Sequence, residues 1–143
     1  MQLTFEMDSD SKAITVAELN NFETMVGLSL PQDYCQHMLT YNGGALDEDV
    51  DHINYIGGGQ GISYFYPIKY GYDKMEDVFN DLSGTIPNGY LAIGKTDGGG
   101  QILISLNSGS TYGKTIEWYP DGTINDLSPS FTQLLNDMVE SDE

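Results

Sequence analysis

The sequence contains no arginine, and its five basic residues are all lysines. Against them stand 22 acidic residues, so the formal net charge is −17. A surface this negative repels phosphate backbones and anionic lipid headgroups, which argues against direct binding to nucleic acids or to acidic membranes. The macromolecular partner that this charge favours is a basic protein.

Cysteine and long apolar runs are also scarce. Cys35 is the single cysteine, so the chain cannot form an internal disulfide. No apolar run approaches the ~18 residues of a membrane-spanning helix. Residues 1–10 are acidic and lack the basic and apolar regions of a signal peptide. Together these absences predict a cytoplasmic protein.

The length of 143 residues fits one domain, because a chain of this size buries roughly two-thirds of its unfolded surface and can fold alone. No internal repeat or long linker interrupts it. We therefore expect a single domain over residues 1–143, with an acidic N-terminal arm at about 1–13 and a frayed acidic tail at about 140–143.

Two helices are predicted in the first third of the chain. Thr15 and Glu18 have the spacing of a capping box, in which each side chain satisfies a free backbone N–H, and Gly27 suits the left-handed residue that follows a helix. A second helix is expected to begin at Pro31, whose missing N–H costs nothing at the first helical position. The Asn-Gly-Gly sequence at 42–44 ends it.

Two more helices are predicted further on. Residues 73–82 place apolar side chains on one face and acids on the opposite face. Ser128 is expected to cap the last helix, with Pro129 at its first position and Phe131 at the start of its apolar stripe.

The strand-like segments come in runs separated by glycine-rich turns. They are residues 52–56, 62–68, 90–94, 101–106 and 115–119. Strands grouped between helices, rather than in strict alternation with them, predict an α+β fold with a mainly antiparallel sheet and helices packed on one side.

No residue pattern indicates an enzyme. Cys35 and His37 stand two apart on a predicted helix, so their side chains point in different directions and do not form a catalytic pair. The glycine-rich stretch 57–61 lacks the lysine and the Ser/Thr of a phosphate-binding loop. With 22 acids, carboxylate pairs arise by chance. We therefore predict no catalytic residue and no cofactor.

Eight acids fall in two groups that are candidates for partner binding: Asp47, Glu48, Asp49 and Asp51 in a loop, and Asp73, Glu76, Asp77 and Asp81 on one face of the third helix. The loop does not fit a calcium site, because His52 and Gly58 occupy the positions where glycine and glutamate are required, so no metal is predicted. Two interpretations stay open for both groups, namely a solvated surface and a surface that attracts a basic partner.

Four tyrosines, Tyr55, Tyr64, Tyr66 and Tyr70, offer aromatic contacts to a partner, because tyrosine is enriched at binding hot spots. Packing on the face of the sheet is an equally good interpretation of them.

Four blocks of the sequence resemble the SUKH superfamily, in the branch named for the yeast Smi/Knr cell-wall regulator. They are residues 19–44 with Leu-Pro at 30–31 and Asn-Gly-Gly at 42–44, the strand 86–94, the turn and strand 97–104, and the pair 116–118 with 130–135. Two positions depart from the family, because Gln101 and Ser105 stand where members often carry acids.

This resemblance implies a non-catalytic immunity protein that binds and neutralises a cognate polymorphic toxin in the cytosol. Such toxins are often nucleases, which are basic, and an acidic inhibitor fits them. The yeast branch implies an alternative, a regulatory or scaffold module that binds a host protein. A third alternative, an enzyme acting on a small molecule near the glycine-rich loops, has no catalytic constellation behind it.

Overall fold

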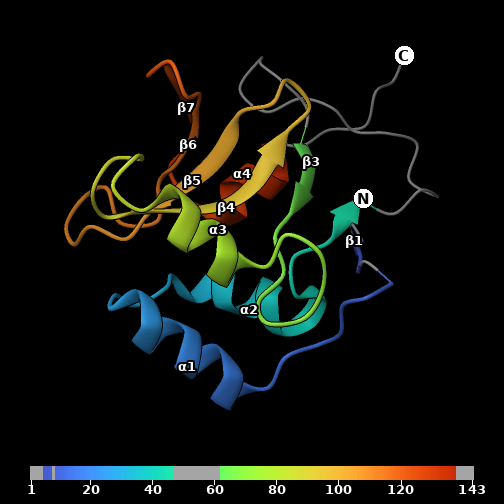
Figure 1. The fold of residues 1–143 in the computed structure, drawn as a ribbon. Helices are drawn as coiled ribbons and strands as arrows, with labels where there is room; N and C mark the ends of the chain where they lie inside the picture. Colours follow the sequence, from blue (N-terminus) through green and yellow to red (C-terminus); the bar gives the residue numbers. More distant parts are fainter. Residues whose placement is uncertain (1–4, 8, 47–61, 138–143) are drawn as a thin grey trace.

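The computed structural model describes residues 5–7, 9–46 and 62–137. Its elements in chain order are β1 (Phe5–Glu6), α1 (Val16–Val26), α2 (Gln32–Tyr41), β2 (Ala45–Leu46), β3 (Ile62–Phe65), α3 (Met75–Leu82), β4 (Tyr90–Thr96), β5 (Gln101–Ser105), β6 (Thr115–Trp118), β7 (Ile124–Ser128) and α4 (Phe131–Asp137). Strands β3 to β7 form an antiparallel sheet in sequential order, and β1 pairs with β2 in a second, short sheet (Figure 1). The predicted α+β fold with an antiparallel sheet is confirmed.

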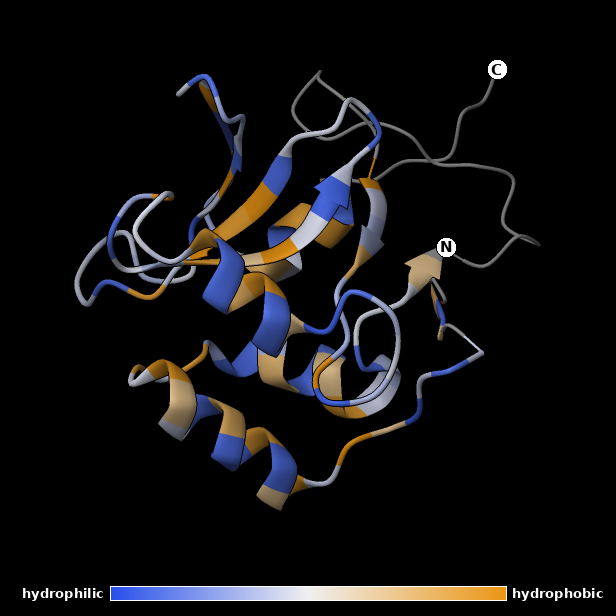
Figure 2. Cartoon of the chain, viewed as in Figure 1, coloured by the Kyte–Doolittle hydropathy of each residue, from blue (hydrophilic) through white to orange (hydrophobic). Residues whose placement is uncertain are grey.

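The core is centred on the middle strands of the larger sheet. Consecutive residues of β4, β5 and β6 are buried, so both faces of these strands are covered. Helix α4 packs against α2, where the ring of Phe131 lies 5.2 Å from that of Tyr34 and 5.1 Å from that of His37. Hydrophobic residues run through the central strands, whereas the visible face of α3 is mainly hydrophilic (Figure 2).

The first two helices begin and end close to the predicted positions. Thr15 and Glu18 form the capping box, and Gly27 ends α1 with a φ of +84°. Pro31 is the cap of α2 rather than its first residue, and Asn42 ends this helix in the left-handed region.

The start of the third helix differs from the prediction. Helix α3 begins at Met75, and Asp73 precedes it with a φ of +54°, a conformation incompatible with a right-handed helix. The expected single helical face carrying four acids is therefore wrong, because only Glu76, Asp77 and Asp81 belong to α3.

The chain before the last helix also differs. Ser128 belongs to strand β7, where it pairs with Thr115, so it does not cap α4. The hydroxyl oxygen of Ser130 accepts a hydrogen bond from the backbone N–H of Gln133 at 3.0 Å and takes that role. Strand β7 was not predicted, because most of its residues are exposed and it lacks the alternation that marks a half-buried strand.

Asn42 joins three segments of the chain. Its fully buried side-chain amide donates hydrogen bonds to the carbonyl oxygens of Lys12 at 3.0 Å and Ile68 at 2.9 Å. Its side-chain oxygen accepts a hydrogen bond from the backbone N–H of Ile68 at 2.8 Å. The end of α2, the N-terminal arm and the segment after β3 are thereby fixed to one another.

Replacing Asn42 with alanine is expected to destabilise the fold by about 3 kcal/mol, because backbone groups of Lys12 and Ile68 lose their buried partner. Urea unfolding measures this change. Asn80→Ala is the matched control, since Asn80 is exposed on α3, and it is expected to change stability by less than about 0.5 kcal/mol. Equal effects of the two substitutions would contradict the role given to Asn42.

His37 is buried among aromatic rings. The rings of Phe5, Tyr41 and Phe65 lie within 4.8 to 5.5 Å of its imidazole. Its Nε2–H donates a hydrogen bond to the carbonyl oxygen of Gly43 at 2.9 Å. Burial lowers the pKa of His37 from 6.5 to about 4, and this hydrogen bond opposes the shift only in part.

The depressed pKa of His37 makes stability depend on pH. Between pH 6.5 and about pH 4, the imidazole of His37 is protonated in the unfolded chain but neutral in the folded chain. The free energy of unfolding therefore falls as pH falls through this window. The expected loss between pH 7 and pH 4 is about 3 kcal/mol. The carboxyl of Glu18, whose pKa is lowered from 4.5 to about 2, adds its own loss of stability as pH falls below about 4.5. His37→Gln is expected to flatten the curve between pH 4 and 6.5, and an unchanged slope in this variant would refute the assignment.

Candidate functional site

A cavity of about 800 Å³ lies between the N-terminal arm and β3. Its walls come from described arm residues between Glu6 and Ser11, from Asn42, Gly44 and Ala45 after α2, from residues 63–65 of β3, and from Pro67 and Tyr72. This volume is in the range of ligand-binding cavities, roughly 300 to 1,000 Å³. Segments far apart in the sequence therefore build one hollow.

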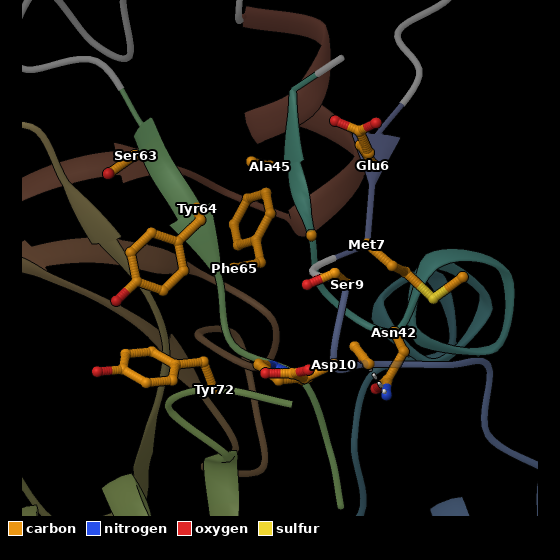
Figure 3. A pocket seen from close by; sticks show the side chains of 13 residues that line it. Glu6, Met7, Ser9, Asp10, Asn42, Ala45, Ser63, Tyr64, Phe65 and Tyr72 are labelled. Atoms are coloured by element: carbon orange, nitrogen blue, oxygen red, sulfur yellow. Dashed lines mark hydrogen bonds between the residues drawn. The ribbon is translucent and has the colours of Figure 1, made fainter. Parts of the chain in front are cut away.

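One wall of the cavity is aromatic. Figure 3 shows the rings of Tyr64 and Tyr72 on one side, Glu6 and Met7 on the opposite side, and Phe65 between them. Tyr72 is 72% exposed, so its ring is accessible to a partner.

Tyr64 is held in place by its neighbours. Its hydroxyl donates a short hydrogen bond to the carboxylate of Asp73, and its ring lies edge-on to that of Tyr66 at 5.7 Å. Burial raises the pKa of the Tyr64 phenol, and the hydrogen bond to Asp73 and the charge of that carboxylate raise it further. The phenol therefore stays protonated and uncharged at neutral pH.

The cavity is negatively charged. Glu6 and Asp10 contribute carboxylates to its lining, and no lysine is among the described residues that line it. Two of the chain's lysines, Lys12 and Lys69, instead stand over the ring of Tyr70, with ammonium nitrogens 4.4 and 5.4 Å from the ring centroid. Lys69 also pairs with the carboxylate of Glu18 at 3.0 Å, so this positive charge is directed toward α1.

Gly44 brings the arm close to β3. Its backbone N–H and carbonyl oxygen pair with Phe65 at 3.1 and 2.8 Å. A Cβ on Gly44 would lie 2.9 Å from the carbonyl oxygen of Glu6, and the φ of +89° is one that side chains disfavour. Glycine at this position thus permits the close approach that forms one side of the cavity.

The structure brings two of the sequence-predicted site residues together, because Tyr64 binds Asp73 beside the cavity. Tyr66 is 1% exposed and donates a hydrogen bond from its hydroxyl to the Gln101 side-chain oxygen at 2.6 Å, which favours the packing interpretation for this tyrosine. The hydroxyl of Tyr70 is likewise engaged, by Glu18.

The remaining acids of the predicted site lie elsewhere. Asp77 and Asp81 are exposed on α3, and the Glu76 carboxylate accepts a hydrogen bond from the backbone N–H of Lys69 at 3.0 Å. The loop acids Asp47, Glu48, Asp49 and Asp51 lie outside the described residues, as do Tyr55 and the predicted strand 52–56 to which it belongs.

Of the residues that line the cavity, sequence reasoning selected only Tyr64, and it missed the two acids, Glu6 and Asp10, and the exposed Tyr72. The only signal was the acidity of the arm, which gives no indication of the strand that the arm packs against.

Among residues 5–7, 9–46 and 62–137, no group of three or more His, Cys, Asp or Glu side chains is arranged to hold a metal ion. No described helix combines the length and apolarity needed to cross a membrane. The thiol of Cys35 is half-buried, and burial raises its pKa to about 11, so little reactive thiolate exists at neutral pH.

Comparison with known proteins identifies the family. Residues 13–137 match the family described as SMI1 / KNR4 family (SUKH-1). The chain belongs to this family. The match runs from the end of the arm through α4, so it includes Asn42, Gly44 and the tyrosine wall, and the resemblance seen in the sequence is confirmed.

A relative in Bacillus subtilis (strain 168), named "Uncharacterized protein YobM", is 36% identical over 89 residues. The aligned part covers 62% of this chain and 45% of the relative. The chain therefore matches less than half the length of this relative, and the likeness indicates no particular activity.

Substitution of Gly44 tests how the cavity is built. Gly44→Ala is expected to destabilise the fold by about 2 to 3 kcal/mol, since it combines a disfavoured φ with a backbone clash against Glu6. Gly27→Ala is the matched control, because Gly27 has a φ of +84° and nothing within 4 Å of the added Cβ. Thermal or urea unfolding is expected to show a cost of about 1 kcal/mol for the control. A control as damaging as Gly44→Ala would show that φ alone matters.

Proposed function

We propose that this SMI1/KNR4-family protein is a non-catalytic immunity protein that binds a cognate basic toxin domain in the cytosol and neutralises it. The observation that carries the proposal is the cavity between the arm and β3, which combines the carboxylates of Glu6 and Asp10 with the rings of Tyr64 and Tyr72. Acidic and aromatic groups at one accessible place suit the recognition of a positively charged protein surface.

The negative charge of the protein guides a basic partner as it approaches. The net charge of −17 creates a field that attracts a basic domain and speeds its association. The exposed carboxylates of Asp77 and Asp81 on α3 contribute to this field from outside the cavity. A toxin that binds nucleic acid carries the complementary positive surface, so this inhibitor competes with the phosphate backbone for it.

Neutralisation of the toxin by this route requires only that the protein covers the toxin's substrate-binding surface. A stable protein complex buries roughly 800 Å² on each partner, more than one cavity supplies, so the cavity forms part of a larger contact surface. Tyr72 of its lining is exposed, and Asp73, the next residue, binds Tyr64 of the same lining. Covering the toxin's substrate-binding surface blocks activity without any reaction on the immunity protein.

Co-expression tests the proposed function. The toxin tested is a basic C-terminal domain of any large secreted protein that a neighbouring gene encodes, produced in a host that it kills. Expression of this protein is expected to restore growth, and the purified pair is expected to associate about tenfold more slowly at about 0.3 M salt than at about 0.05 M. Absence of protection, together with stable binding to a host regulatory protein, would instead establish the scaffold alternative.

Reversal of charge on α3 tests the steering contribution. Asp77→Lys/Asp81→Lys is expected to reduce the association rate by about tenfold with little change in melting temperature, because both side chains are exposed. Asp97→Lys/Asp121→Lys makes the same change in net charge at two exposed turns and is the control. Stopped-flow measurements that give equal rates for the two variants would show that net charge matters and the α3 surface does not.

A further inference from the structure

We propose that the cavity between the arm and β3 receives an arginine side chain of the partner protein. The inference rests on the proposed function, since it names the chemical group of the basic partner that this site recognises. It concerns the cavity alone and not the acids of α3, none of which lines it.

The walls present the groups that a guanidinium binds. A guanidinium is planar, stacks on aromatic rings and donates paired hydrogen bonds to a carboxylate. Tyr64 and Tyr72 place their rings on one side of the cavity, and the acidic residues Glu6 and Asp10 belong to the same lining. The hydroxyls of Ser9 and Ser63 add further acceptors.

The aromatic wall is ordered before the partner arrives. The hydrogen bond from Tyr64 to Asp73 and the edge-on contact with Tyr66 fix the Tyr64 ring. Because Tyr64 also lies in β3 opposite Lys95 of β4, its backbone is held by the sheet. Little conformational entropy is therefore lost at this ring when a side chain enters.

The charge in the cavity selects among occupants. Carboxylates of Glu6 and Asp10 repel an anionic ligand, and a neutral apolar ligand would bury them without a partner. A lysine ammonium satisfies the charge but is compact and strongly hydrated, so it gains less from the tyrosine faces. A guanidinium can pair with a carboxylate and stack on an aromatic ring at the same time, so arginine suits this lining better than lysine.

Titration with small probes tests the inference without the partner. Isotope-labelled protein is titrated with Nα-acetyl-arginine amide, followed by backbone amide NMR signals. The arginine probe is expected to produce saturable shifts at Asp10, Gly44 and Tyr72, with an affinity in the ~1 to 10 mM range that suits one side chain. The lysine analogue is expected to bind several-fold more weakly, and the uncharged citrulline analogue to give no saturable shift.

Two pairs of variants locate the binding. Asp10→Asn and Tyr72→Leu change exposed side chains of the cavity, so the fold is expected to persist, and each is expected to weaken the arginine probe about five- to tenfold. Asp97→Asn and Tyr112→Leu make the same chemical changes at exposed positions outside the lining and are expected to leave affinity within about twofold.

The outcomes separate this inference from the proposed function. Equal shifts with arginine and citrulline, or shifts outside the cavity, overturn the inference, and if growth protection still occurs the proposed function stands. Arginine-specific binding in the cavity supports the inference. If the toxin is nevertheless not neutralised, only the proposed function is overturned, and the arginine belongs to another protein partner.

Discussion

The buried amide of Asn42 is the interaction on which the functional side of this fold depends. It binds the backbone of Lys12 in the arm and of Ile68 after β3, and it does so from a left-handed residue that ends α2. The two glycines that follow have φ values of +89°. A Cβ on Gly43 would lie 2.6 Å from the carbonyl oxygen of Tyr66, so the Asn-Gly-Gly sequence both turns the chain and lets three backbones meet.

The hydrogen bonds of Asn42 hold together the segments of the chain that enclose the cavity. Asn42 and Gly44 line it directly, the arm carries Glu6 and Asp10 to one side, and β3 carries Tyr64 to the other. Under the proposed function, recognition works over two ranges of distance. The overall acidity would steer a basic protein from afar, and the tyrosines and carboxylates of the cavity would select the side chain that enters it.

The features that the sequence predicted correctly depend on contacts between residues that are close together in the chain. The capping box of Thr15 and the stop at Gly27 depend on neighbouring residues, and both are as expected. Asp73 could not be placed in the same way, because its left-handed conformation accompanies a tertiary hydrogen bond to Tyr64. Strand β7 was not predicted because it is polar and exposed. The cavity was not predicted because Asp10 and Tyr64 are distant in the sequence and come together only through tertiary contacts, such as those of Asn42 and Gly44.

Hydrogen–deuterium exchange of the protein alone and in complex with the cognate toxin domain tests most directly whether a basic partner binds at this cavity. The account predicts slower exchange on binding in peptides that contain the cavity-lining residues of the arm, such as Glu6 and Asp10, and those of residues 63–72, such as Tyr64 and Tyr72. Slower exchange confined to α1 or to β7, with these peptides unchanged, would contradict it and place the partner elsewhere on the molecule.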